Sequence, residues 1–366
     1  MGLFKSFTVA ASFLSLGSAS VVRRSFNVPS SNGFPNPDAA QQKVIGAQAG
    51  GLLPNSPLPS SLDAGSTTAF QLIAFNELFE TSYFSSLLHN ITERLPGYEA
   101  ADHRVATAIK AVLAQEELHA IGAIATLQNA GKFAPSACKY QFPTASLVDS
   151  IFFAETFTAA VLGALQGANV LFSQGGLSPV VQLISSIIGQ EGEQNGYYRY
   201  FLNRIPSEKP FLTYVPAPFA FSVLQAVVVP GSCPYPLSNI NLPIFPLLFP
   251  NGRPVPIDLL KPEDQIIKFT GDLSQAPNGK KYIGKPCDGL YLTYTAGQQL
   301  PISVSIFNVK WKGSQITFEA QFPYTANVLA GFTHAALTTT NKFDTQDAVA
   351  GSTLVGPALL QVNNPI

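Results

Sequence analysis

Residues 105–127 read VATAIKAVLAQEELHAIGAIATL. Apolar residues recur in it every three or four positions, which predicts an amphipathic helix. Glu116 and His119 fall on the apolar stripe three positions apart, so their side chains project from the same face. A carboxylate is costly to bury unless it is paired or bound to a cation. The acid in this stripe therefore indicates a polar site inside a helical bundle.

Three further segments, at 67–88, 145–171 and 178–205, repeat this pattern. Each has a glutamate in the middle of its apolar stripe, and these are Glu77, Glu155 and Glu191. Together with the helix at 103–130, they predict a four-helix bundle whose stripes pack against one another. The gap of about 15 residues between the second and third helices suits a crossover connection.

Four carboxylates at one level of a bundle repel one another, so they would share protons or bind cations. A two-metal carboxylate bundle uses one Glu from each of two helices and Glu-x-x-His from the other two. Here Glu116 and His119 form one Glu-x-x-His, but Gln194 stands where the second histidine would be. Gln194 is then either a weak oxygen ligand or an amide beside the ligands. We predict a site for two iron or manganese ions with six candidate ligands: Glu77, Glu116, His119, Glu155, Glu191 and Gln194.

The same residues allow other interpretations. The acids could form a buried, partly protonated carboxyl network that has lost its metal. Neighbouring acids could replace ligands if a helix is rotated, and these are Glu80, one turn beyond Glu77, and Glu117 and Glu193. Three tyrosines could be redox-active or hydrogen bond to the ligands, although packing is the more common role: Tyr83, Tyr197 and Tyr198. The histidines outside the stripes are expected at the surface: His89, His103 and His334.

Four short stretches carry a family resemblance: FNELFE at 75–80, QEELH at 115–119, FAETF at 153–157 and QEGEQ at 190–194. They resemble the ferritin-like domain of secreted fungal stress and late sexual development proteins, a group related to plant desiccation-related proteins. A later PGSCP run at 230–234 is also similar to that group. The resemblance covers residues 67–205 and implies a ferritin-like fold, but no established reaction.

The N-terminus is typical of a secretory signal peptide. Lys5 precedes an apolar stretch from Phe7 to Leu16, and a small-residue cleavage site follows at 17–19. The apolar stretch is shorter than the roughly 20 residues that span a bilayer, so we expect a secreted or cell-wall protein without a membrane span. Asn90 begins an N-glycosylation sequon, Asn-Ile-Thr, which fits this route. Three cysteines predict one disulfide and one thiol, with the pairing left open: Cys138, Cys233 and Cys287.

Composition divides the chain into six parts, and the fold class is mainly α. A signal peptide at 1–19 and a flexible leader at 20–65, rich in Ser, Pro, Asn and Gly, precede the bundle at 66–205. A Pro-rich connection at 206–256 leads to a small all-β module at 257–345, expected to be a sandwich. The remaining residues, 346–366, are expected to form an irregular tail.

Charge and motif content exclude several functions. Charged residues make up 12% of the chain, about half the usual share of roughly 25%, and no basic run indicates nucleic-acid binding. No P-loop or Gly-x-Ser-x-Gly nucleophile motif is present. Two hypotheses remain: a secreted ferritin-like protein of fungal stress or sexual development with a metal site, or a non-enzymatic structural or interaction protein with a vestigial one. In the second, the β module would bind a cell-wall polymer or a protein. The sequence leaves open whether the chain is an enzyme.

Overall fold

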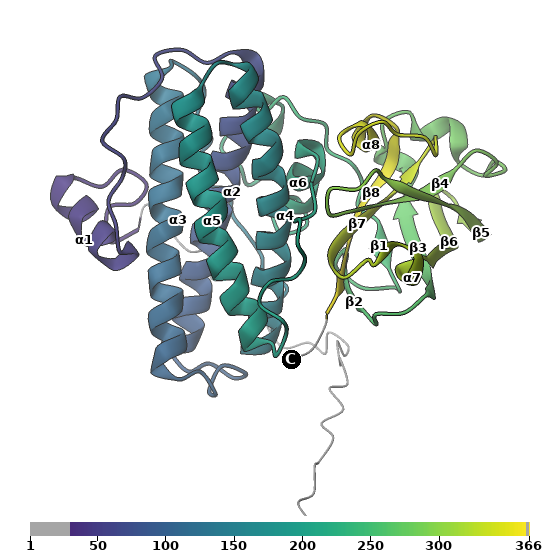
Figure 1. Cartoon of the computed structure of the whole chain (residues 1–366), viewed down its shortest axis with the longest axis horizontal. Helices are drawn as coiled ribbons and strands as arrows, with labels where there is room; N and C mark the ends of the chain where they lie inside the picture. The colour runs from purple at the N-terminus through teal and green to yellow at the C-terminus, as the bar shows by residue number, and fades with distance from the viewer. Residues whose placement is uncertain (1–29, 364–365) are drawn as a thin grey trace, which may run out of the picture.

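Four long helices lie side by side in the computed structural model, which describes residues 30–363 and 366 (Figure 1). They are α2 (Ala64–Thr92), α3 (His103–Asn129), α4 (Leu147–Gln174) and α5 (Ser178–Phe201). Three of them begin at a side chain that accepts a hydrogen bond from a first-turn amide, namely Asp63, Asp102 and Ser146. The predicted four-helix bundle is confirmed, with helix ends close to those expected.

Helices α2 and α4 are antiparallel neighbours in the bundle. The Phe70 and Phe172 rings contact at one end with centroids 4.6 Å apart, and Phe79 contacts Phe157 further along at 5.0 Å. The buried apolar residues form one cluster on each side of the central glutamates, one around Phe70 and the other around Phe79. The glutamates therefore lie in a buried, largely apolar interior.

A crossover at residues 130–146 joins α3 to α4, as the gap in the pattern predicts. It lies against the connection that follows the bundle, since Tyr140 forms a β-bridge with Val228 and Cys138 is disulfide-bonded to Cys233. Cys287 is a free thiol, so the predicted single disulfide is confirmed. The connection is less irregular than expected, because α6 (Ala217–Leu224) forms in it and packs against α2.

The C-terminal module is a single sheet of eight strands in the order β1-β3-β6-β5-β4-β7-β8-β2. The strands are β1 (Phe249–Pro250), β2 (Ile257–Leu260), β3 (Gln265–Asp272), β4 (Tyr291–Ala296), β5 (Ile302–Lys312), β6 (Gln315–Phe322), β7 (Gly331–Thr338) and β8 (Thr353–Val362). Short helices α7 (Tyr324–Asn327) and α8 (Ala348–Gly351) lie in its loops. The long strand β5 pairs with β4 through its first residues and with β6 through its last, so the sheet folds over into a sandwich-like, nearly closed barrel.

Strands β7 and β8 are buried along their whole length. Phe332 and Leu359 pack with Ala159 of α4 and Phe219 of α6, while alternate residues of both strands face the interior of the module. The expected irregular tail is therefore corrected, because β8 lies within it and joins the module to the bundle. The expected surface position of His334 is also wrong, since this β7 residue is 1% exposed.

The expected flexible leader contains a helix, α1 (Ala39–Ala49). The Asp38 side chain caps it by accepting hydrogen bonds from the first-turn amides, and the Gln41 side chain bonds back to the Asp38 amide. Ile45 packs against Ala114 and Leu118 of α3. This capping box with one buried apolar residue accounts for an ordered helix in an otherwise polar segment.

The signal peptide and the glycosylation site stay predictions. The signal peptide at 1–19 lies outside the described residues. Asn90 lies in the last turn of α2 and is half-buried. Among the described residues, one helix, α4, is long and apolar enough to cross a bilayer, and 72% of its most apolar stretch is buried inside the protein. Its apolarity is accounted for by its place in the core of the bundle.

Candidate metal centre

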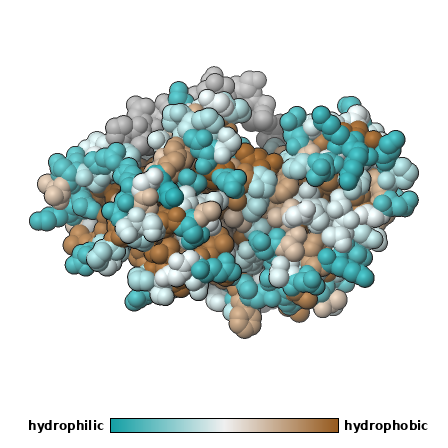
Figure 2. Space-filling view, turned by 90° about the horizontal axis from the view of Figure 1, so that it is seen from above, coloured by the Kyte–Doolittle hydropathy of each residue, from teal (hydrophilic) through white to brown (hydrophobic). Residues whose placement is uncertain are grey.

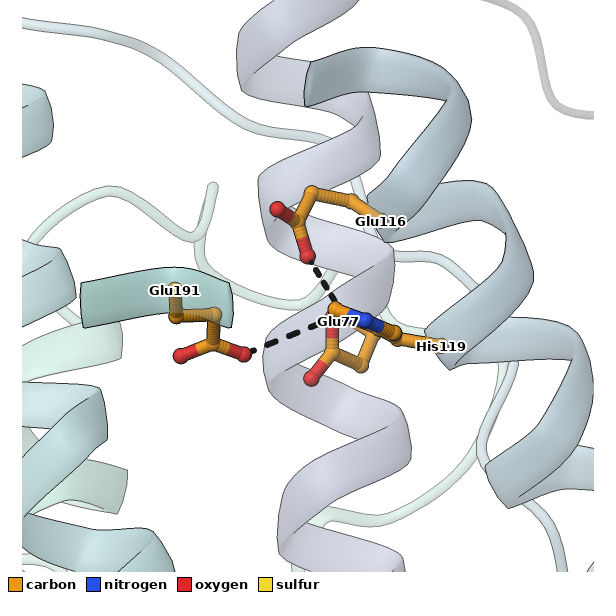
Figure 3. Close-up of side chains that lie close together, drawn as sticks. All are labelled: Glu77, Glu116, His119 and Glu191. Atoms are coloured by element: carbon orange, nitrogen blue, oxygen red, sulfur yellow. Dashed lines mark hydrogen bonds and ion pairs between the residues drawn. The ribbon is translucent and has the colours of Figure 1, made fainter. Parts of the chain in front are cut away.

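Four side chains from three helices converge in the middle of the bundle: Glu77 of α2, Glu116 and His119 of α3, and Glu191 of α5 (Figure 3). One oxygen or nitrogen atom from each lies within 4.8 Å of the others. His119 Nδ1 is 2.8 Å from Glu116 Oε2, 3.7 Å from Glu77 Oε2 and 3.7 Å from Glu191 Oε1. Three carboxylates and one imidazole thus face a common centre.

The oxygens at this centre lack the partners that buried carboxylates normally have. The three glutamates are at most 1% exposed. Among the described residues, Glu77 Oε2 and both oxygens of Glu191 accept no hydrogen bond. Buried polar atoms without partners are costly and point to a site for a water molecule or an ion. Atoms bound to one ion at about 2.1 Å lie at most about 4.2 Å apart, so the group would contract by about half an ångström around a cation.

The charges of these groups are tightly linked. Burial raises the pKa of Glu77 to about 7, although His119 opposes this. Burial also raises the pKa of Glu191, and the carboxylates of Glu77 and Glu116 raise it further. For His119, burial lowers the pKa, but Glu116 and Glu77 outweigh it and raise the pKa well above its usual value. The metal-free cluster therefore retains protons that a bound cation would displace.

The neighbouring acids considered as replacement ligands lie outside the group. Glu80 is buried beside it, and burial together with the charges of Glu116, Glu77 and Glu191 raises its pKa. Asn76 donates to Glu80 Oε1 at 3.0 Å. Glu117 accepts hydrogen bonds from Asn32, and Glu193 is exposed.

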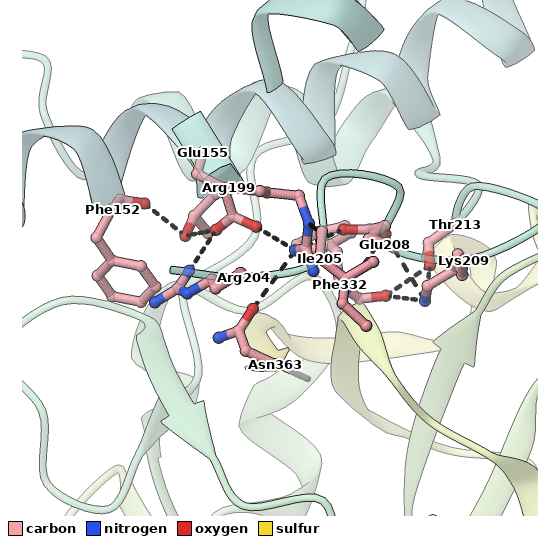
Figure 4. Close-up of polar contacts among 11 residues, drawn as sticks. Phe152, Glu155, Arg199, Arg204, Ile205, Glu208, Lys209, Thr213, Phe332 and Asn363 are labelled. Atoms are coloured by element: carbon pink, nitrogen blue, oxygen red, sulfur yellow. Dashed lines mark hydrogen bonds and ion pairs between the residues drawn. The ribbon is translucent and has the colours of Figure 1, made fainter. Parts of the chain in front are cut away.

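Glu155 does not join the converging group, and its place among the metal ligands is corrected (Figure 4). Its Oε1 accepts a hydrogen bond from Arg199 Nη1 at 2.7 Å, and its Oε2 accepts one from Arg204 Nη1 at 3.2 Å. Burial raises the pKa of Glu155 to about 7, and both arginines oppose this. Two guanidinium groups thus provide the positive charge that a second metal ion would have provided.

Gln194 also lies outside the group. Its Nε2 donates to Glu116 Oε1 at 2.6 Å and to Gln115 Oε1 at 3.1 Å. The amide therefore orients a candidate ligand, which is one of the two roles open to it from the sequence.

The Glu155 network continues to the β module. Arg199 Nη1 lies 3.5 Å from Glu208 Oε2, and Lys209 donates to the Phe332 carbonyl of β7 (Figure 4). Burial lowers the pKa of Lys209 to about 8. Sequence reasoning missed this network. Only Arg199, two turns beyond Glu191 on α5, carried a visible signal, since an arginine on a buried face requires an acid partner.

The three tyrosines have different environments. The Tyr83 hydroxyl donates to the Ser150 carbonyl at 2.6 Å, which is a structural role. Tyr197 is half-buried. Tyr198 is buried, and its hydroxyl has no hydrogen-bond partner among the described residues. Burial raises the pKa of Tyr198, and the nearby carboxylates of Glu116 and Glu80 contribute to this.

Comparison with known proteins agrees with this geometry. Residues 67–204 match the family model described as the ferritin-like domain. A search of curated proteins found no match. The matched residues run from the first turn of α2 to just beyond α5, so they include all four residues of the converging group. The helical part of this chain is therefore a ferritin-like domain, with a cluster of glutamates and a histidine that could hold a metal ion.

Proposed function

We propose that the ferritin-like domain binds one divalent iron or manganese ion through Glu77, Glu116, His119 and Glu191. The observation that carries the proposal is the set of three buried carboxylate oxygens without partners, facing an imidazole nitrogen. Carboxylate and imidazole together suit iron and manganese. A divalent cation would also relieve the repulsion among the three acids.

A single ion fits these residues better than the two expected from the sequence. A two-metal site holds ions about 3.5–4 Å apart and needs a second ligand set. Glu155 would belong to that set, but it is bonded to Arg199 and Arg204. The remaining candidate, Gln194, uses its amide to hold Glu116.

The chain's own residues would prepare the site. Gln194 fixes the Glu116 carboxylate, and the apolar clusters pack on either side of the site. Iron or manganese in a carboxylate–imidazole site supplies chemistry with oxygen or peroxide when bound. Glu80, an acid with a raised pKa beside the ligands, could hold a proton next to that chemistry.

The wider role we propose is that of a secreted fungal protein of stress response or sexual development. Its support is the resemblance of the four glutamate-containing stretches, the N-terminal signal pattern and the disulfide between Cys138 and Cys233, which suits an oxidising compartment. The β module would contact a cell-wall polymer or a protein. A non-enzymatic protein with a vestigial site is the second candidate, favoured by the arginine pairing of Glu155.

Elemental analysis of protein expressed with iron and manganese available tests the metal proposal. We expect about one ion per chain, and close to none in Glu191→Gln and His119→Ala. Glu193→Gln is the matched control, because Glu193 is exposed on the same helix two residues from Glu191. Glu155→Gln should also keep its metal. Metal-free wild-type protein, or two ions per chain with one lost in Glu155→Gln, would overturn the proposal.

A further inference from the structure

A cavity of about 530 Å³ lies between α2, α4 and the segment that contains α6. At one end it is lined by Asn76 and the candidate ligand Glu77. At the other end it is lined by Ala64 and Leu171, near the start of α2 and the end of α4. Seen from above, the molecule has brown, apolar surface between the bundle on the left and the β module on the right (Figure 2). The cavity thus leads along two helices to the proposed metal centre.

Small side chains create this space. Alanine or glycine occupies many of the lining positions on the two long helices and α6, including Ala69, Ala164, Ala168 and Ala220. Leu, Val and Ile make up about half of the other lining residues, and the rest are polar. An apolar cavity of about 150 Å³ already holds a benzene-sized molecule, so this one has room for a considerably larger apolar ligand.

The cavity is long and narrow. The lining residues of α2 extend from Ala64 to Glu77, which at the helical rise corresponds to about 20 Å. Volume divided by this length gives a mean cross-section of about 27 Å², which is close to the cross-sectional area of one extended aliphatic chain. The shape therefore favours a linear molecule.

The charges on the walls select against an anionic ligand. The residues that line the cavity include two acids, Glu77 and Asp347, and no lysine, arginine or histidine. Asp347 accepts a hydrogen bond from Tyr214, another lining residue. In the protein without bound metal, a carboxylate entering the cavity would face negative charge without a cation to balance it.

We infer that this cavity binds a neutral, linear aliphatic molecule with a polar end group, such as a long-chain alcohol or aldehyde. The aliphatic part of the ligand would lie between α2 and α4, and its polar end group would lie at Asn76 and Glu77. The inference rests on the proposed function only for the metal beside that end group. Binding in the cavity does not itself require the metal.

Isothermal titration calorimetry of 1-decanol with the full-length, metal-free protein tests this inference. We expect 1-decanol to bind at one site per chain and decanoate to bind at least about tenfold more weakly. Ala164→Leu places an isobutyl group in the cavity and should weaken 1-decanol binding at least about tenfold, since one methylene alters affinity in an apolar pocket about 10–200-fold. The matched control is Ala108→Leu on α3, half-buried and outside the cavity lining. Leu171→Ala, which lengthens the cavity, should shift preference from 1-decanol to 1-dodecanol.

Each outcome has a defined meaning. Equal binding of 1-decanol by Ala164→Leu and wild type, with no change of preference in Leu171→Ala, would overturn the inference. Tight binding of decanoate would overturn the neutral ligand class. In manganese-loaded protein, 1-decanol should alter the Mn(II) electron paramagnetic resonance spectrum of the wild type and leave that of Ala164→Leu unchanged. If the protein binds no metal but 1-decanol binding still depends on the cavity variants, the metal proposal fails and the binding site stands.

Discussion

Replacement of Arg199 by methionine tests whether this arginine stabilises the buried negative charge of Glu155. The Arg199 side chain is 2% exposed, and its Nη1 donates to Glu155 at 2.7 Å. Its Nε donates to the Ile205 carbonyl at 2.8 Å. Methionine keeps most of the length and apolar bulk of the side chain while removing the charge and these hydrogen bonds. The variant leaves two acids, Glu155 and Glu208, with one cation fewer in a buried site.

Removal of one partner from a buried ion pair costs about 3–5 kcal/mol. Because Arg204 still bonds to Glu155 at 3.2 Å, we expect the lower end, about 3 kcal/mol of unfolding free energy for Arg199→Met. Glu155→Gln removes the charge that needs balancing. The double variant should therefore lose less than the sum of the single variants, by about 1–3 kcal/mol.

The cost of Arg199→Met should also depend on pH. The pKa of Glu155 is already raised to about 7 by burial, and Arg199 opposes this rise. Loss of the arginine raises the pKa further, so Glu155 takes up a proton in the folded variant as pH falls. The destabilisation is then complete above that raised pKa and shrinks below it. We expect a larger loss of stability at pH 8 than at pH 6.

Urea unfolding followed by circular dichroism measures the stability loss of Arg199→Met, its non-additivity with Glu155→Gln and its dependence on pH. Arg104→Met is the matched control, because Arg104 pairs with Asp102 at 2.8 Å but its side chain is 82% exposed. A surface pair of this kind contributes little, so no measurable change is expected. The reasoning would be refuted if Arg199→Met behaved like Arg104→Met, or if its effect and that of Glu155→Gln were additive.

Three further predictions concern stability and are measured by the same unfolding experiment. Burial lowers the pKa of His334 to about 4. The protein should therefore lose about 3 kcal/mol of unfolding free energy as the pH falls from the ordinary histidine pKa of about 6.5 toward 4. In His334→Gln this pH-dependent loss should be absent. Replacing Cys138 and Cys233 by alanine opens a loop of sequence separation 95 and should cost about 4–5 kcal/mol, whereas a loss below about 1 kcal/mol would contradict the loop-entropy argument. Tyr83→Phe removes the buried hydrogen bond to the Ser150 carbonyl and should cost about 1 kcal/mol, and a neutral result would show that the carbonyl finds another donor.

The bundle could be predicted because its signal is local and repeated. Each long helix shows an apolar stripe, and three of them begin at a capping residue that is visible in the sequence. The sequence predicts a β module, but it places the end of the module at residue 345, before β8. Strand β8 is buried on both faces, so it shows no alternation of polar and apolar residues, and Pro357 interrupts its pattern. Because β8 packs on both faces, its sequence lacks the alternating pattern from which a strand is normally predicted.

Three of the four central glutamates converge, although all four look equivalent in the sequence. Periodicity places each acid on a buried face but does not identify the group across from it. For Glu155 that group is the pair Arg199 and Arg204, and Arg199 lies beside Tyr198, which is on the predicted stripe of α5. A buried arginine needs an acid as much as a buried acid needs a cation. The predicted stripes contain no arginine, so a prediction that paired Arg199 with one glutamate would have needed its burial, and it would have left three acids and His119 for a single metal ion.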